Sequence, residues 1–383
     1  MKIVVASDSF KGSLSSTEVA AAAMRGIKAV YPDCEVVVVN VADGGEGTVG
    51  AVVEALHGKI VVAKVSDPLG RAVQAHYSIA GGTAIIEMAA ASGLPLLSAK
   101  ERNPWLTSTH GTGEMIMDAI GRGCRDFLIG IGGSATNDAG TGMLQAMGFR
   151  FYDIHGKEIR DCCGGRLGDI RRIDDSGVTE EVRQSTFTVA CDVDTPFCGR
   201  EGAAYVFAPQ KGADAGMVAR LDAGMASLAK VIEEKYHINI VPIAGAGAAG
   251  GMGGGFCACL NATLKRGIDM VLDAIGFDTI IQGADLVITG EGKIDSQTAK
   301  GKTAAGVLAR AKAQDIPVVA IAGRVEMCDS VAQMGFAGIY PILEEKVPLE
   351  VAMQADFAAA NVEKTVKNLH MSQIFRTFAG SNK

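Results

Sequence analysis

The first forty residues restrict the fold more than any other stretch of the chain. A short apolar run, residues 3–6, ends in polar residues, and Ser15 and Glu18 have the spacing of a capping box, which predicts a helix from about Ser16 to Val30. Residues 35–40 (EVVVVN) then have the continuous β-branched pattern of a strand buried on both faces. A strand, a helix and a second strand in this order are typical of a parallel sheet, so we predict an α/β protein.

The rest of the chain shows two different patterns of predicted strands and helices. Residues 59–65, 71–79 and 83–88 are short runs divided by turn signals, which predicts an antiparallel meander, and a helix near 113–121, a strand at 126–131 and a helix near 139–147 follow. Strands at 285–289, 317–321 and 338–340 then alternate with helices near 304–313, 327–334 and 355–378. We predict a discontinuous Rossmann-like α/β domain, residues 1–57 and 283–383, with a mixed α/β domain, residues 58–282, inserted into it.

Composition narrows the class of protein. The 383 residues are 48% hydrophobic and carry a formal net charge of -7, an acidity that argues against a bulk nucleic-acid-binding protein. Residues 238–264 are uncharged, but seven of the eleven residues from Gly245 to Gly255 are glycine, and each costs a helix ~1 kcal/mol relative to alanine. We interpret this stretch as a glycine-rich loop and predict no membrane span. Without a secretion signal, the nine cysteines are expected to be reduced and the protein cytoplasmic.

Several strand-like runs end in loops that combine glycine with charged or hydroxyl residues. The loop 7–15 couples Lys11 with serines and a following helix start, which suits an anion. The loop 42–48 places Asp43 and Glu46 among glycines, and the loop 290–297 repeats this pattern with Glu291 and Asp295. Carboxylates beside a flexible backbone suit a phosphate–Mg²⁺ group, although each loop would also read as an ordinary capped turn.

Two further loops carry charged residues, and the first of them follows a predicted strand. Residues 190–196 (ACDVDTP) contain Asp192 and Asp194, and residues 207–212 (FAPQKG) contain Lys211. The number of such loops favours phosphoryl transfer, which depends on positioning, Mg²⁺ ligands and cations more than on an activated nucleophile. A strict phosphate-binding P-loop is absent, because Ser296 stands where that motif needs glycine.

The loop 130–138 (GIGGSATND) supports a different enzyme class. Gly130, Gly132 and Ala135 have the spacing of a dinucleotide-binding fingerprint, and Asp153 lies 18 residues beyond Ala135, near the position of the acid that binds the ribose. A nicotinamide-dependent oxidoreductase is therefore the rival enzyme. A sugar-acid-sensing regulator is the non-enzymatic rival, although no basic helix-turn-helix pattern accompanies it.

Taken together, these loops resemble the class I glycerate kinase family. The resemblance rests on nine segments that occur in the family's order between residues 7 and 298: SDSFKGSLS, VADGGEGT, DPLGR, EMAAASGL, GIGGSATNDAG, ACDVDTP, APQKGA, GAGAAGGMGGG and VITGEGKIDSQT. The departures are small: Ser7 replaces a usual proline, Asp194-Thr195 replaces the commoner Thr-Asn, and Ala139 stands where glycine is common.

The resemblance implies a two-domain α/β fold and Mg²⁺-dependent phosphorylation of D-glycerate by ATP, with 2-phosphoglycerate as the expected product and 3-phosphoglycerate as the alternative. From the acidic composition and the absence of a predicted membrane span, we expect no nucleic-acid or membrane partner. The oligomeric state stays open, a homo-oligomer included.

Within this chemistry we assign roles to individual residues. Lys11 and Arg71 are candidates for the glycerate carboxylate or the transferred phosphate, because cations suit both. Asp192 is the candidate for orienting or deprotonating the glycerate hydroxyl, and Asp295 is its alternative. The remaining candidates are Ser134, Asn137 and Asp138 for substrate binding, Gly132, Gly133, Ser134, Gly290, Gly292 and Lys293 for the nucleotide phosphates, and Asp43, Glu291 and Asp295 for Mg²⁺.

Overall fold

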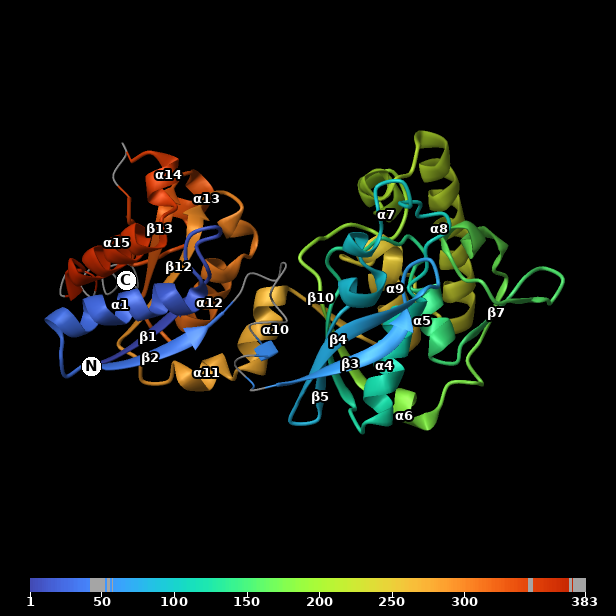
Figure 1. Cartoon of the computed structure of the whole chain (residues 1–383), viewed down its shortest axis with the longest axis horizontal. Helices are drawn as coiled ribbons and strands as arrows, with labels where there is room; N and C mark the ends of the chain where they lie inside the picture. Colours follow the sequence, from blue (N-terminus) through green and yellow to red (C-terminus); the bar gives the residue numbers. More distant parts are fainter. Residues whose placement is uncertain (42–51, 54–55, 57, 344–346, 372–373, 375–383) are drawn as a thin grey trace. The chain divides into compact units, whose positions relative to one another are not determined.

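The computed structural model describes residues 1–41, 52–53, 56, 58–343, 347–371 and 374 (Figure 1). The chain forms two compact units: the first is Met1–Ala55 with Ile268–Lys383, and the second is Leu56–Gly267. Relative to the ranges predicted from sequence, residues 268–282 group with the first unit, where α11 (Phe277–Ile280) lies. The domain ranges themselves stay a prediction, because compactness alone does not show that each unit folds independently.

The first unit is built on a five-stranded parallel sheet to which both ends of the chain contribute. Its strand order is β14-β13-β12-β1-β2, and β1 pairs in parallel with both β2 and β12. The strands are β1 (Lys2–Ser7), β2 (Glu35–Asn40), β12 (Leu286–Ile294), β13 (Val318–Val325) and β14 (Gly338–Pro341).

Helices lie on both faces of this sheet. On one face, α1 and α15 lie side by side (Figure 1) and share an apolar core with Ile3, Val5 and Ile288. Because strand side chains alternate, the buried Val4 and Val287 point to the opposite face, against which α12 packs. The helices are α1 (Ser16–Val30), α10 (Gly267–Ala274), α11, α12 (Thr303–Lys312), α13 (Asp329–Ala332), α14 (Leu349–Ala352) and α15 (Ala355–Lys367), with a 3-10 turn, η4, at Thr298–Lys300.

Local sequence signals explain where α1 begins but not how β2 is buried. The predicted capping box is present: the Ser15 amide donates to Glu18 Oε2 at 2.8 Å, and the Glu18 amide donates to Ser15 Oγ at 3.3 Å. The prediction that residues 35–40 are buried on both faces is wrong. β2 is the edge strand of the sheet, and Val38 is 39% exposed, because a β-branched run reports strand propensity and not a central position.

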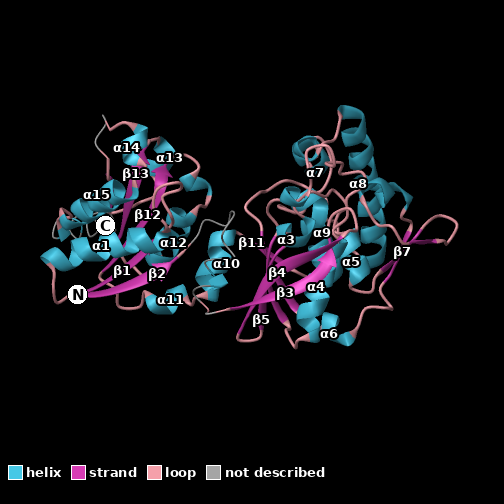
Figure 2. Cartoon of the chain, viewed as in Figure 1, coloured by secondary structure: helices cyan, strands magenta, loops and turns pink. Residues whose placement is uncertain are grey.

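The second unit contains a mixed six-stranded sheet with the order β11-β10-β6-β5-β4-β3. Its strands are drawn in magenta in Figure 2. The predicted meander is confirmed, since β3, β4 and β5 pair in antiparallel fashion, whereas β5, β6, β10 and β11 are mutually parallel. The strands are β3 (Lys59–Ser66), β4 (Ala72–Ala80), β5 (Thr83–Glu87), β6 (Asp126–Gly130), β10 (Thr186–Ala190) and β11 (Thr263–Lys265).

Helices and a small separate sheet complete this unit. The small sheet pairs β7 (Arg150–Tyr152) with β8 (Glu158–Ile159) and β9 (Arg172–Asp174). The helices are α3 (Ala89–Ser92), α4 (His110–Gly121), α5 (Thr141–Ala146), α6 (Glu180–Arg183), α7 (Ala203–Phe207), α8 (Ala215–Tyr236) and α9 (Ala248–Leu260). The 3-10 turns are η1 (Leu94–Leu96), η2 (Gly164–Asp169) and η3 (Pro209–Lys211).

The prediction of a glycine-rich loop at 245–255 is wrong for most of its length. Residues from Ala248 belong to α9, which includes a left-handed stretch at residues 249–251 and whose glycines are buried. The glycines are needed for close contact with neighbouring backbone: a Cβ on Gly250 would lie 2.2 Å from the Thr136 carbonyl oxygen, and one on Gly255 would lie 2.4 Å from that of Ala139. Packing therefore outweighs the low helix propensity of glycine here.

Other sequence expectations concern helix length, thiols and membrane spans. The helices expected near 327–334 and 355–378 are shorter in the described residues, where they span Asp329–Ala332 and Ala355–Lys367. All nine cysteines are described, and each is a free thiol. Across the described part of the chain, no helix combines the length and the apolar character that crossing a bilayer requires.

The packing of α1 on α15 generates a prediction about Gly26. Gly26 is buried in α1, and a Cβ there would lie 2.6 Å from the Glu363 carbonyl oxygen and 3.1 Å from Val366 Cβ. Alanine normally stabilises a helix interior by roughly 1 kcal/mol relative to glycine, but here it would overpack the helix contact. We expect Gly26→Ala to lower the free energy of unfolding by about 1–3 kcal/mol, measured by urea unfolding.

The matched control is Gly121→Ala at the end of α4, where a Cβ would meet no atom within 4 Å. It should leave stability unchanged or slightly raised. An equal effect of the two substitutions would contradict the close packing of α1 on α15.

Candidate active site

The order of strands in the first unit marks a place where ligands bind in open α/β sheets. The chain leaves β1 towards β2 on one side and leaves β12 towards β13 on the other, so the strand order reverses between β1 and β12. Ligands commonly bind outside the carboxyl ends of the two strands at such a switch point. The segments that leave these ends are the loop after Ser7 and the segment that leads from β12 to α12.

Asp8 joins these two segments. It is 6% exposed; its Oδ1 accepts from the Ser9 amide at 2.6 Å, and its Oδ2 accepts from the Thr303 hydroxyl at 3.1 Å. The Asp8 amide donates to the carbonyl of Gly290 at 2.9 Å. The loop after β1 is therefore tied to β12 and to the start of α12, which fixes the backbone that carries Lys11.

The interpretation of residues 290–297 as a loop is wrong for its first half. β12 continues to Ile294, with Glu291 opposite Ala322 and Lys293 opposite Arg324 of β13. The backbone of Gly290 and Gly292 therefore lies within the sheet, which argues against an open phosphate cradle there. Because these glycines have no side chain, the loop after β1 can pack closely against β12. A Cβ on Gly290 would lie 2.9 Å from Ser7 Oγ, and one on Gly292 would lie 3.5 Å from the Lys11 amide nitrogen.

Glu291 stands between these glycines as a buried carboxyl group. It is 6% exposed, and its Oε1 has no hydrogen-bond partner among the described residues. Burial raises the pKa of Glu291 to about 7, opposed by a hydrogen bond from Thr298 and by the charge of Lys302. A buried carboxylate with an unmet oxygen is costly unless a cation or a donor reaches it, so Glu291 fits the predicted metal-binding role.

Lys293, near the end of β12, forms an ion pair with Asp295, the first residue beyond the strand. Lys293 Nζ lies 2.9 Å from Asp295 Oδ2 and 2.7 Å from Glu326 Oε2, so two carboxylates already compensate its charge. The lysine holds the pKa of Asp295 below its usual range, which keeps that carboxylate ionised. Asp43, the third predicted metal ligand, lies outside the described residues. In the parts of the chain that are described, no three or more His, Cys, Asp or Glu side chains gather as a metal cluster.

Lys11 lines a cavity formed by its own loop. The cavity measures about 600 Å³, within the range of small-molecule sites, and is bordered by Ser9, Lys11, Gly12, Ser13, Leu14 and Ser15. Ser13 Oγ is buried with no partner among the described residues, and Ser15 begins α1. An exposed cation, serine hydroxyls and a helix N-terminus together suit an anionic group.

In the second unit, the parallel strands bring other candidates to one edge of the sheet. Gly130 of β6 is in register with Ala190 of β10, which is in register with Lys265 of β11. The loop 131–140 and the loop that carries Asp192 therefore leave the sheet at the same edge. The turn 67–71 between β3 and β4, which holds Arg71, faces this edge because β4 runs antiparallel to β5.

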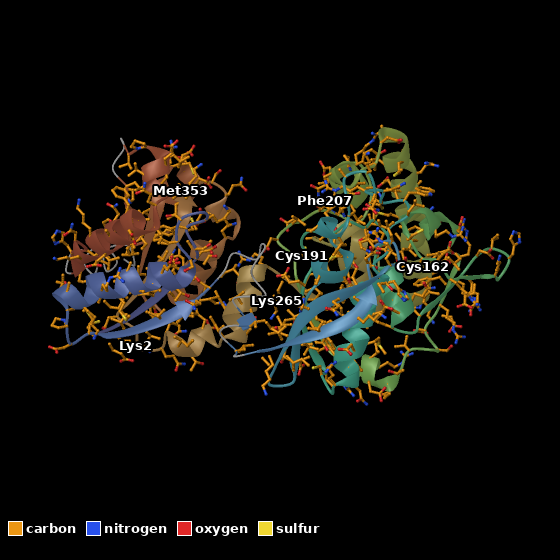
Figure 3. All side chains as sticks on the ribbon, in the orientation of Figure 1. Lys2, Cys162, Cys191, Phe207, Lys265 and Met353 are labelled. Atoms are coloured by element: carbon orange, nitrogen blue, oxygen red, sulfur yellow. The ribbon has the colours of Figure 1, made fainter. Side chains whose placement is uncertain are left out.

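Asp192 is exposed two residues beyond β10, and its carboxylate is oriented by backbone. Its Oδ1 accepts from the Gly267 amide at 2.8 Å. The neighbouring Cys191 amide donates to the Lys265 carbonyl at 2.8 Å, and Figure 3 labels both residues at these adjacent strand ends. This position suits a carboxylate that meets a substrate, because the side chain is oriented by a backbone amide and lies on the surface.

Arg71 has a weaker case as a substrate cation. Its Nε lies 2.5 Å from Asp67 Oδ2 and its Nη1 lies 2.6 Å from Glu101 Oε1. Asp67 also accepts from the Leu69 and Arg71 amides, so it shapes the turn. Two carboxylates thus compensate the charge that Arg71 would offer to an anion.

Ser134 and a buried lysine form a polar cluster in the second unit. Lys211 is 1% exposed, and its Nζ donates to Ser134 Oγ and to the Thr136 carbonyl, both at 2.6 Å. Gly132 and Gly133, directly before Ser134, are exposed. Burial lowers the pKa of Lys211 to about 7, opposed by the charge of Asp138.

Asn137 and Asp138 are fully buried, which argues against a direct substrate contact for either. Asp138 Oδ2 accepts from the amide and the hydroxyl of Thr109, both at 2.8 Å, and from the Gly142 amide at 3.2 Å. It thus caps the amino ends of α4 and α5. Asn137 Nδ2 donates to Met225 Sδ at 3.2 Å, while Asn137 Oδ1 has no partner among the described residues.

The dinucleotide fingerprint does not correspond to a dinucleotide-binding unit. Asp153 follows β7, which belongs to the small sheet and not to the sheet that contains β6. Its carboxylate accepts from the amides of His155 and Lys157, both at 2.9 Å, so it shapes a turn. The next helix after Gly130, α5, starts only at Thr141. The glycine spacing of the fingerprint therefore occurs here without the βαβ geometry that binds a dinucleotide.

The sequence reasoning noted Lys211 but assigned it no role. The signal that could have singled it out is its place directly before Gly212 in residues 207–212 (FAPQKG). Only the folded chain shows that this lysine is buried under Ser134, because the two residues are 77 positions apart.

Comparisons with known proteins relate the whole chain to one family. The model of the glycerate kinase family matches residues 3–374. The chain is 48% identical to a glycerate kinase of Bacillus subtilis (strain 168), with 97% of each chain covered. It is 44% identical to the glycerate 2-kinase of Escherichia coli (strain K12), with 96% of this chain and 97% of the relative covered. A crystal structure assigned as glycerate kinase 2 from Salmonella typhimurium LT2 superimposes with a TM-score of 0.84, at 42% identity and full coverage of both chains.

The buried lysine generates a prediction about stability. Because burial lowers the pKa of Lys211 from 10.5 to about 7, the unfolded chain binds more protons at this site than the folded chain between these pH values. The contribution of Lys211 to the free energy of unfolding is therefore least favourable below pH 7 and rises with pH from about 7 to 10.5, by at most ~1.4 kcal/mol per pH unit.

Urea unfolding of the wild type and of Lys211→Met at pH 7, 8 and 9 measures this slope. The stability of the wild type relative to the variant should rise with pH. Lys230→Met, at an exposed lysine of α8, serves as the control and should show no such trend. A constant difference for Lys211→Met would contradict the lowered pKa.

Proposed function

The chain belongs to the glycerate kinase family, and on that premise we propose that it transfers the terminal phosphoryl group of ATP to D-glycerate, with ADP and 2-phosphoglycerate as products. The observation that carries this function is the similarity along nearly the whole chain to a glycerate 2-kinase. The geometry is compatible with it, because each unit places charged and hydroxyl groups at the carboxyl edge of its parallel strands.

Phosphoryl transfer requires a positioned acceptor, compensation of phosphate charge and a place for one proton. In the proposed reaction the glycerate hydroxyl oxygen forms a bond to the terminal phosphorus, the bond from that phosphorus to the bridging oxygen breaks, and ADP leaves. We assign the hydroxyl proton to Asp192, whose carboxylate is exposed and held by the Gly267 amide. Lys11, in its cavity, would contact the glycerate carboxylate or the transferred phosphate.

We propose that Mg²⁺ accompanies ATP at the end of β12. Mg²⁺ is usually held by one or two carboxylates together with substrate phosphates, so a dense protein cluster is not required. Glu291 fits this role through its buried oxygen without a described partner, and Asp295 fits through its ionised carboxylate. When bound, the ion would compensate phosphate charge; Asp43 stays a predicted ligand.

The proposed activity predicts a strict dependence on three components. Purified protein should release ADP only when ATP, Mg²⁺ and D-glycerate are all present, as followed in a coupled ADP assay with glycolate, lactate and tartronate as alternative acceptors. NMR of the product should show the phosphate on the second carbon. Phosphate on the third carbon would overturn the position, and glycerate-dependent NADH formation without ADP release would overturn the kinase.

The assigned roles of Asp192 and Lys11 predict different kinetic effects. Asp192→Asn keeps size and hydrogen bonding but removes the charge, so kcat should fall ~10²-fold or more with little change in the KM for ATP. Lys11→Ala removes a cation that contacts an anion in both ground and transition states, so the KM for glycerate should rise.

Matched controls are available for both variants. Asp194→Asn removes a nearby exposed acid, and Lys157→Ala removes an exposed turn lysine; neither should change the kinetics. A thermal melt of each variant separates chemistry from loss of fold. A normal kcat for Asp192→Asn would move the base role to Asp295, and unchanged KM values for Lys11→Ala would reduce its loop to a capped turn.

A further inference from the structure

Lys211 is a buried cation that none of the assigned catalytic roles uses. Its Nζ is held by Ser134 Oγ and by the Thr136 carbonyl, both at 2.6 Å and both from the segment that follows β6. Among the described residues, no carboxylate lies within 4.0 Å of its Nζ. The charge of Asp138 favours the charged form of this buried lysine, but burial opposes it more strongly, so an anion that comes near would stabilise the ammonium group.

The contact with Lys211 also determines what the Ser134 hydroxyl can do. A charged ammonium can only donate, so Ser134 Oγ accepts from it, and the hydroxyl hydrogen must point to another acceptor. Next to it, Gly132 and Gly133 are exposed, and a Cβ on Gly132 would meet no atom within 4 Å. A hydroxyl donor next to a cation is therefore adjacent in the chain to an exposed stretch of backbone.

The segment that carries Ser134 is fixed on several sides. The Leu94 amide donates to the Gly133 carbonyl at 2.9 Å, and the Thr107 hydroxyl donates to the Ala135 carbonyl at 2.9 Å. A Cβ on Gly250 of α9 would lie 2.2 Å from the Thr136 carbonyl oxygen, so the backbone has no room to move towards α9. Such a segment presents its donors in one arrangement, which is what recognition of a small anion requires.

We infer that Lys211 is a positioning residue for an oxyanion bound at Gly132–Ser134: it directs the Ser134 hydroxyl towards the anion and supplies the compensating charge from behind. The oxyanion is a carboxylate or a phosphate group. This inference rests on the proposed function, under which the oxyanion is either the carboxylate of glycerate or a phosphate group of ATP. Glycines 132 and 133 leave the backbone open to either group.

The test compares Lys211→Met and Ser134→Ala with the wild type in steady-state kinetics. Both variants should raise the KM for the same substrate by at least about tenfold, leave the KM for the other within about twofold and change kcat less. The matched control, Lys230→Met, removes an exposed lysine of α8 and should leave all constants unchanged. Ser134→Ala keeps the lysine in place, so it reports on the site even where Lys211→Met does not fold.

Calorimetric titrations with D-glycerate alone and with ADP alone identify the source of the oxyanion. The ligand whose affinity falls in both variants is the one bound at Gly132–Ser134. In the double variant the two losses should not add, because Lys211 acts through Ser134. The inference is overturned by unchanged affinity for both ligands in Ser134→Ala, or by a uniform loss of kcat alone. A wild type that binds an anion at this site but releases no ADP would instead refute the proposed kinase function and leave the anion site standing.

Discussion

The second unit depends on a close approach of backbone to backbone between α9 and the segment 136–139. The left-handed turn at residues 249–251 brings glycines against carbonyl groups, with the Ala139 amide donating to the Gly250 carbonyl at 3.0 Å. Because this contact leaves no room for side chains, it fixes the segment from one side, while Lys211 fixes it from another. This buried arrangement therefore fixes the position of the exposed residues 132–133.

The two units use the same principle of strand-end loops but hold them by different forces. In the first unit, carboxylates dominate: Asp8 ties the loop after β1 to α12, and the buried Glu291 leaves one oxygen without a described partner. In the second unit, a buried cation and backbone groups dominate around Ser134. In the proposed reaction, the buried Glu291 would suit a metal ion and the buried Lys211 would suit an anion, two kinds of group that phosphoryl transfer must hold.

Much of the fold and part of the candidate site follow from sequence, and the misses have physical causes. The capping box at Ser15 and the alternating runs of the meander are local signals, and both occur as predicted. The glycines of α9 and the strand extension through Glu291 were misjudged because tertiary packing outweighed local propensity. Asp138 was a candidate for substrate binding, yet it caps two helices, and the sequence around Lys211 does not show that this lysine is buried. Whether a polar side chain is buried depends on residues far apart in the chain, and its possible role depends on that burial.

The first unit's sheet also determines the order in which the protein can be completed during synthesis. β1 lies between β2 and β12, so it has only one neighbour until the ribosome has extended the chain from Asn40 to Leu286. If the ribosome adds about 5–20 residues per second, one edge of β1 stays unpaired for on the order of tens of seconds. By the time β12 is made, all residues of the second unit have been synthesised. An unpaired strand edge is a template for aggregation. The strand order therefore leaves one edge of β1 unpaired until β12 has been synthesised.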